Sequence, residues 1–215
     1  MNPLHNTRPH SDWQSATTSS DARKLLESLP KPLPEPVLHP VLVAVSGLPG
    51  SGKSFFSRRL AERIPLVVLE SDALRKVLVP SPLHTAEEST SLFRAIHQLI
   101  AMLLKDGVPV LLDATNLAEA HREPLYRIAA QCDARVVMVL AKAPVEVVRQ
   151  RLETRMHLSQ RQDSSEADWE VYQRLRPTQE PIHRSHIVVD TSRDMVPAME
   201  KVLREIHHWM RKATN

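Results

Sequence analysis

The sequence predicts an α/β fold in which the strands of a parallel sheet alternate with helices. From residue 41 onward, short apolar runs rich in Val and Leu alternate with longer amphipathic segments. The first run, Val41–Ser46, is apolar almost throughout, which is typical of a strand buried on both faces of a sheet. Three of the four glycines of the chain, Gly47, Gly50 and Gly52, follow it at once, where a tight turn into a helix is expected. This alternation predicts βαβ units with helices on both faces of the sheet.

The individual elements follow in chain order. The glycine-rich segment 47–54 leads into a helix that ends near Arg63, and residues 66–70 form the second predicted strand. Thr85 and Glu88 have the spacing of a capping box, so a long helix is expected from there to Asp106. The remaining elements are a strand over 108–112, a helix over 119–131, a strand over 135–141, a helix over 144–157, a short helix after the polar break 158–165, a strand over 187–190 and a terminal helix to about residue 212.

Residues 1–40 are expected to form a proline-rich tail, and residues 41–215 the folded domain. The first 20 residues are polar and show no apolar periodicity, so we predict that they are disordered. Residues 21–29 are compatible with a short helix, with Asp21 as its candidate N-cap. Five prolines between residues 30 and 40 then favour an extended spacer. A passive tail is favoured over a dedicated binding motif.

Composition limits the classes of protein to which the chain can belong. Hydrophobic residues make up 42% of the chain and charged residues 25%, which supports a core and excludes a wholly disordered protein. The longest apolar runs are far shorter than the roughly 20 residues that a membrane span needs. A single cysteine, Cys132, excludes an internal disulfide and a cysteine zinc site, and with no secretory signal in view we expect a cytoplasmic protein. The net charge of +3 permits an anionic substrate but does not by itself indicate nucleic acid.

The segment 47–54, GLPGSGKS, has the G-x-x-x-x-G-K-[ST] pattern of a phosphate-binding loop between a strand and a helix. Glycines let the backbone N–H groups turn around a phosphate, and the helix N-terminus adds partial positive charge. Lys53 can reach the β- and γ-phosphates, and Ser54 can bind Mg²⁺. We therefore expect ATP and Mg²⁺ as cofactors; a guanine-selective N-K-x-D motif is absent. The expected nucleotide contacts are Gly47, Leu48, Pro49, Gly50, Ser51, Gly52, Lys53, Ser54, Phe55 and Arg151.

Two segments that follow predicted strands carry further polar residues. Asp72 follows the second strand and could accept the proton of an attacking hydroxyl, although an Asp there could also cap the next helix. Arg75 lies one helical turn further on and could bind an anionic group of the acceptor. Asp113 ends the third strand, where a second Mg²⁺ contact is expected, or it opens a turn. Thr115 and Asn116 could orient the acceptor or Asp113 itself.

Arginines cluster on the helix before the polar break. Arg149, Arg151 and Arg155 have even helical spacing, and the last two share one face. Arginines beside a lid, here expected at about 149–176, can neutralise charge on a transferred phosphoryl group. The alternative is a solvated basic face paired with Glu146 and Glu153. Of these residues, Arg155 is favoured over Arg149 for the catalytic role.

Together, GLPGSGKS, ESDALR (70–75), LLDATN (111–116) and RQRLETR (149–155) resemble the P-loop kinase family that includes the polynucleotide 5′-kinase domain. The nearest likeness is to predicted kinases of the AAA_33 type, with zeta-toxin-like and chloramphenicol-phosphotransferase-like kinases as more distant relatives. The resemblance spans residues 41–212 and implies a P-loop NTPase fold with sheet order 2-3-1-4-5 and a helical lid. It also implies Asp72 as the general base, Arg75 on an acceptor phosphate, Asp113 on the metal side and Arg155 on the ATP phosphates.

The leading hypothesis is therefore an ATP-dependent kinase that phosphorylates a hydroxyl of an acceptor. The resemblance to polynucleotide kinases leaves a nucleic-acid 5′-hydroxyl open as the acceptor, but no basic groove is evident in the sequence, and a small molecule is slightly favoured. The alternative from another class is a nucleotide-gated binding or regulatory module without phosphoryl transfer, which would need neither Asp72 nor an acceptor pocket.

Overall fold

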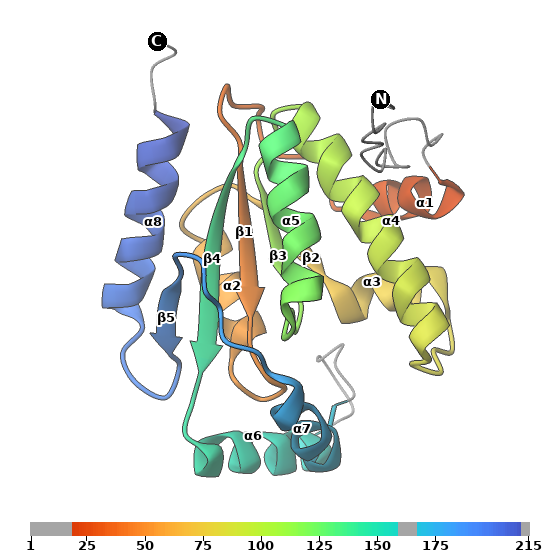
Figure 1. The fold of residues 1–215 in the computed structure, drawn as a ribbon, viewed down its shortest axis with the longest axis vertical. Coiled ribbons are helices and arrows are strands. Elements are labelled where there is room, and N and C mark those ends of the chain that lie inside the picture. Colours follow the sequence, from red (N-terminus) through yellow and green to blue (C-terminus); the bar gives the residue numbers. More distant parts are fainter. Residues whose placement is uncertain (1–18, 159–166, 212–215) are drawn as a thin grey trace, which may run out of the picture.

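The computed structural model describes residues 19–158 and 167–211, which form one parallel sheet with helices on both sides (Figure 1). The strands are β1 (Val41–Ser46), β2 (Val67–Glu70), β3 (Val110–Asp113), β4 (Arg135–Lys142) and β5 (Ile187–Asp190). They pair in the order β2-β3-β1-β4-β5, all in parallel. This confirms the predicted fold class and strand order.

The helices lie in two layers because the central strand is buried on both faces. Leu42 and Ala44 of β1 pack with α4 (Ala86–Lys105) and α5 (Glu119–Gln131), while the alternate residues Val41, Val43 and Val45 pack with α2 (Lys53–Ala61) and α8 (Val196–Met210). Figure 1 shows α2 and α8 on one side of the sheet and α4 and α5 on the other.

The carboxyl ends of the strands point toward α6 (Val145–Leu158) and α7 (Trp169–Leu175), which lie beyond that edge of the sheet (Figure 1). The loop after β1 leads into α2, β2 leads directly into α3 (Ser71–Leu78), and a short 3₁₀ turn, η1 (Arg176–Thr178), follows α7. Ligands of open parallel sheets bind at this edge. The sheet therefore brings the ends of β1, β2 and β3 together where the sequence motifs lie.

The segment before β1 differs from the expected tail. Helix α1 (Ser20–Ser28) begins at Ser19, whose hydroxyl accepts the N–H of Ala22, so Ser19 and not Asp21 is the N-cap. Ala22 and Leu25 are fully buried, and α1 packs against α3 and α4. The proline-rich stretch is held too, since the Trp209 indole donates to the Pro40 carbonyl at 3.1 Å. Residues 19–40 thus pack on the sheet domain, and residues 1–18 lie outside the described part of the chain.

Element bounds otherwise differ from expectation by a few residues. Helix α2 ends at Ala61, and β3 begins at Val110 because residues 108 and 109 precede the ladder that pairs Val110 with Leu42. Most of the polar break predicted at 158–165 falls outside the described residues. None of the described helices has the length and apolar character needed to cross a membrane.

Candidate active site

A cleft of about 680 Å³ opens at the carboxyl ends of β1, β2 and β3. Twelve of the residues singled out from the sequence line this cleft: Pro49, Gly50, Gly52, Lys53, Ser54, Phe55, Asp72, Arg75, Asp113, Thr115, Arg151 and Arg155. Four others do not appear in its wall: Gly47, Leu48, Ser51 and Asn116. The structure therefore gathers most of the predicted set, from four separate segments, around one space.

The phosphate-binding loop needs glycine for both its backbone and its surroundings. Gly50 and Gly52 have φ angles of 72° and 86°, a region that other residues adopt at a cost. A Cβ atom on Gly52 would lie 2.6 Å from the Thr191 hydroxyl oxygen, and one on Gly50 would lie 2.9 Å from a Val148 methyl carbon. Gly52 is also the N-cap of α2, so the first N–H groups of that helix face the loop.

Lys53 lies at the start of α2 with its ammonium group directed back at the loop. Its Nζ donates to the Leu48 carbonyl at 3.1 Å. Burial lowers the pKa of Lys53, and the nearby carboxylates of Asp113 and Asp72 act in the opposite direction. The Lys53 ammonium group is thus partly buried at the cleft, bound to a loop carbonyl and under the influence of two acids, where it can meet a phosphate.

Asp113 and Ser54 form a pair of oxygen donors beside Lys53. The Asp113 residue is 5% exposed, and its Oδ2 atom is buried with no hydrogen-bond partner in the described structure. Burial raises the pKa of Asp113, whereas Lys53 and a hydrogen bond from Ser54 lower it. Hard oxygen donors suit Mg²⁺, which binds through one or two protein groups together with phosphate oxygens and water. The two residues therefore fit a magnesium ion.

Asp72 lies in the first turn of α3, and the structure does not use it as the helix cap. The N-cap is Glu70, whose side chain makes no capping hydrogen bond, and Asp72 lies within the helix. The Asp72 carboxylate instead lines the cleft, and its charge acts on both Lys53 and Asp113. The capping alternative weighed for Asp72 is thus wrong, and its carboxylate is available to a ligand in the cleft.

Arg75, one turn beyond Asp72, has a partner that the sequence analysis missed. Its Nη1 donates to Glu88 Oε1 at 2.5 Å and its Nη2 to the Ser89 hydroxyl at 3.3 Å. Glu88 was noted only for its capping-box spacing. The Thr85 hydroxyl does accept the Glu88 N–H, but the Glu88 carboxylate accepts from Arg75 and from the Leu83 N–H.

The segment after β3 divides into one residue that faces the cleft and one that does not. Thr115 lines the cleft, and its carbonyl accepts the Gly47 N–H at 3.1 Å. Asn116 is 2% exposed, and its side-chain amide donates to the Val45 carbonyl at 3.2 Å. Asn116 therefore fastens this segment to β1, in contrast to the acceptor contact expected from the sequence.

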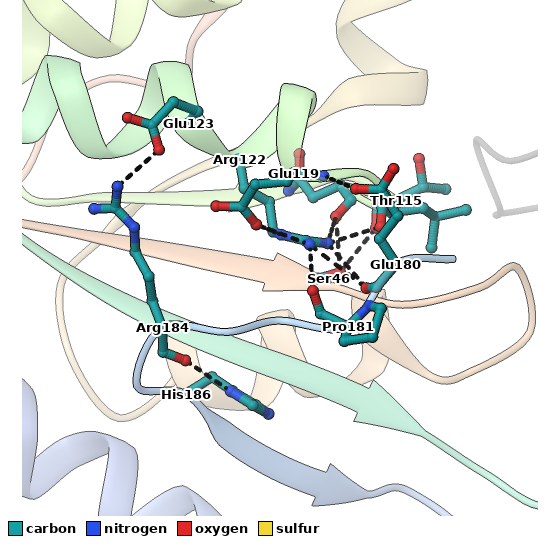
Figure 2. Close-up of polar contacts among 11 residues, drawn as sticks. Ser46, Thr115, Glu119, Arg122, Glu123, Glu180, Pro181, Arg184 and His186 are labelled. Carbon is teal, nitrogen blue, oxygen red and sulfur yellow. Dashed lines mark hydrogen bonds and ion pairs between the residues drawn. The ribbon is translucent and has the colours of Figure 1, made fainter. Parts of the chain in front are cut away.

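A fully buried arginine, Arg122, holds the same segment from behind (Figure 2). Its Nη1 donates to the carbonyls of Asn116 and Leu117 at 3.0 and 2.7 Å, and its Nη2 donates to the Pro181 carbonyl at 2.8 Å. Glu180, beside Pro181, accepts the Glu119 N–H at 2.6 Å. Arg122 thus joins the loop after β3 to the chain that follows η1. Because its partners are backbone carbonyls far apart in the sequence, no motif indicated this role.

The arginines of α6 occupy three different environments. Arg151 donates to the Thr191 hydroxyl at 2.9 Å, the Thr191 carbonyl at 2.8 Å and the Gly50 carbonyl at 3.3 Å, so it links the phosphate loop to the loop after β5. Arg155 lines the cleft, and one of its Nη groups donates to the Ala167 carbonyl. Arg149 pairs with Glu153 at 2.7 Å, with both side chains at least half exposed, which fits the solvated-face alternative. Thr191 gave no signal in the sequence.

The chain is similar in sequence to proteins named as kinases. The chain is 29% identical over 116 residues to an L-seryl-tRNA(Sec) kinase of Methanococcus maripaludis, which covers 52% of the chain and 44% of that protein. The alignment with a shikimate kinase of Nitrobacter winogradskyi is 29% identical and covers 71% and 70% of the two chains. The chain spans less than half of the seryl-tRNA kinase but most of the shikimate kinase.

Solved structures share the fold at lower sequence identity. The Mycobacterium tuberculosis APS kinase in complex with AMPPNP and APS superposes with a TM-score of 0.59 at 21% identity, covering 80% of this chain and 99% of the other. The AAA_33 family, described as an AAA domain, matches residues 42–182, well over half of the sequence. The chain therefore belongs to the AAA_33 family, and its relatives among characterised proteins include P-loop kinases.

Proposed function

We propose that the protein is an ATP-dependent kinase that transfers the γ-phosphoryl group to a hydroxyl of an acceptor. The observation that carries the proposal is that one cleft holds three features: the phosphate loop with Lys53, the Asp113–Ser54 pair, and the carboxylate of Asp72, which does not serve as a helix cap. A module that only bound a nucleotide would need the first two features but not the third. Relatives named as seryl-tRNA and shikimate kinases support the same chemistry, since serine and shikimate offer hydroxyl groups.

In this proposal the nucleotide phosphates lie in the loop 47–54, with Lys53 moving from the Leu48 carbonyl to the phosphate oxygens. Mg²⁺ would be held by Ser54 and Asp113, and when bound it would offset negative charge on the β- and γ-phosphates. Arg151 and Thr191 support the conformation of the loop 47–54, because three hydrogen bonds join Arg151 to Thr191 and to the Gly50 carbonyl.

Transfer then requires a base for the attacking hydroxyl and cations beside the oxygens of the transferred group. Asp72 accepts the proton of the acceptor hydroxyl while the hydroxyl oxygen forms a new bond to the γ-phosphorus. The bond between the γ-phosphorus and the ADP oxygen breaks at the same time. Lys53 and Arg155, both in the cleft wall, stabilise the charge that develops on the transferred group. Helices α6 and α7 serve as the lid in this scheme, over about 149–176. The acceptor lies on the side of Arg75 and Thr115.

The test is transfer of label from γ-labelled ATP, with Mg²⁺, to a panel of oligonucleotides with free 5′-hydroxyls, nucleosides, sugars and other alcohols. We expect label on one class of acceptor. Lys53→Ala should remove nucleotide-dependent activity, and Asp72→Asn should keep ATP binding but lose transfer. Asp106→Asn, an exposed acid at the end of α4, is the matched control and should behave as wild type. Label released only as inorganic phosphate, at a rate that Asp72→Asn does not change, would instead support the nucleotide-gated module.

A further inference from the structure

Arg75 lines the cleft on the side proposed for the acceptor, and its ion pair with Glu88 is largely shielded from water. The Arg75 side chain is 9% exposed and that of Glu88 is 13% exposed, and the Arg75 guanidinium also donates to the Ser89 hydroxyl. Two further hydrogen bonds hold Glu88 in place. Its carboxylate also accepts the Leu83 N–H at 2.9 Å, and its backbone N–H donates to the Thr85 hydroxyl. If the Glu88 side chain turned away from Arg75, its carboxylate would therefore lose both the Arg75 guanidinium and the Leu83 N–H.

We infer, on the basis of the proposed kinase function, that Glu88 determines the acceptor class by reserving Arg75 for an uncharged group. The acceptor would present a hydroxyl or carbonyl oxygen to Arg75, and a phosphate would be excluded there. This differs from the role that the resemblance to polynucleotide kinases implied for Arg75, which was contact with an acceptor phosphate.

A phosphate meets two costs at this position. If it displaced Glu88 from the guanidinium, it would leave a largely shielded carboxylate without its cation, which is unfavourable. If Glu88 stayed, the phosphate would lie against a carboxylate of the same charge. The hydrogen bond from Arg75 holds the pKa of Glu88 below its usual range, so Glu88 carries this negative charge at neutral pH.

An uncharged oxygen meets neither cost. Arg75 has five N–H groups, of which Glu88 and Ser89 engage two, and its Nε is buried with no hydrogen-bond partner in the described structure. Phe93 lies one turn beyond Ser89 on α4 and lines the same cleft, so it offers an apolar surface beside the remaining donors. A neutral polyol or another uncharged hydroxyl compound matches this combination.

Phosphate binding can be measured without knowing the acceptor. Protein loaded with AMP-PNP and Mg²⁺, so that the loop 47–54 is filled, is titrated with inorganic phosphate by calorimetry. Wild type should show no binding that depends on Arg75, whereas Glu88→Gln should bind phosphate about ten-fold or more tightly than wild type. This gain should vanish in the double variant Glu88→Gln, Arg75→Met. Glutamine keeps an oxygen for the Leu83 N–H, so the variant should retain the fold.

Glu87→Gln is the matched control, because it removes the same charge from an exposed neighbour on the same helix. The inference is overturned if wild type binds phosphate and Arg75→Met abolishes that binding, or if Glu88→Gln gains no more than Glu87→Gln does.

A second measurement compares transfer to acceptors that carry the same hydroxyl with and without a phosphate, such as adenosine 3′-monophosphate and adenosine. Glu88→Gln should move the preference toward the phosphorylated member by about ten-fold, and an unchanged ratio would contradict the inference. If no compound is phosphorylated at all, the proposed function fails, and the phosphate titration still decides the role of Glu88.

Discussion

Replacing Arg122 with methionine removes the guanidinium that holds the loop after β3 to the chain beyond η1. Methionine retains much of the apolar volume of the arginine stem, so the lost interactions are chiefly polar. Three carbonyls, those of Asn116, Leu117 and Pro181, lose donors at 3.0, 2.7 and 2.8 Å. Figure 2 shows Pro181 and Glu119 beside the Arg122 side chain.

The size of the effect follows from burial. A buried acceptor left without its donor costs about 1–3 kcal/mol, and breaking a buried ion pair costs about 3–5 kcal/mol. Glu119, the anionic partner at 2.9 Å, is 37% exposed, so water replaces part of that interaction and its contribution is small. We therefore expect Arg122→Met to lower the free energy of unfolding by about 3–5 kcal/mol, chiefly through the carbonyls.

Urea denaturation followed by circular dichroism measures this loss. The matched control is Arg184→Met, whose side chain is 51% exposed, pairs with Glu123 at 2.8 Å and stacks over Tyr126. It should cost about 1 kcal/mol or less. If Arg122→Met loses no more stability than Arg184→Met, the assignment of Arg122 as the link between the two segments is refuted.

Three further changes have defined outcomes. Gly52→Ala should weaken ATP binding by about ten-fold or more, because alanine is strained at φ 86° and meets Thr191; Gly107→Ala, also at positive φ but near Val37, should leave ATP affinity unchanged in equilibrium titration. Asp113→Asn should raise the melting temperature of the ligand-free protein at neutral pH. Burial raises the pKa of Asp113 in the folded state, so the wild type loses stability as pH rises above the pKa that Asp113 has in the unfolded chain. A lower melting temperature of the variant in scanning calorimetry would contradict this. Burial lowers the pKa of His97 to about 4, so stability should fall as pH drops from about 6.5 toward 4, and His97→Leu should make that pH dependence shallower in melting experiments.

The predictable parts of the site are residues that belong to a contiguous sequence motif or that directly follow a predicted strand. Lys53 and Ser54 belong to a contiguous loop pattern, and Asp72 and Asp113 follow apolar strands, so their gathering at one sheet edge follows from parallel topology. Asn116 shows where this reasoning stops. It lies three residues beyond Asp113, but the backbone turns at a φ of 45° and directs its amide toward Val45.

Contacts between distant segments were not predictable from motifs. The ion pair of Arg75 with Glu88 joins two helices, and Arg151 reaches Thr191 across 40 residues. The burial of Leu25 in α1 was missed for a different reason, since the polar and proline-rich composition around it outweighed a short helical pattern. Each of these contacts depends on how distant segments pack together, whereas local composition carries information only about neighbouring residues in the sequence.

The central claim is that Asp72 takes the proton from an acceptor hydroxyl as the γ-phosphoryl group moves. Its most direct test is single-turnover transfer from γ-labelled ATP to the acceptor found in the panel, with wild type and Asp72→Asn both saturated with nucleotide. The account predicts equal ATP affinity for the two proteins and a loss of transfer of about 100-fold or more in Asp72→Asn. Transfer at the wild-type rate in Asp72→Asn would contradict it.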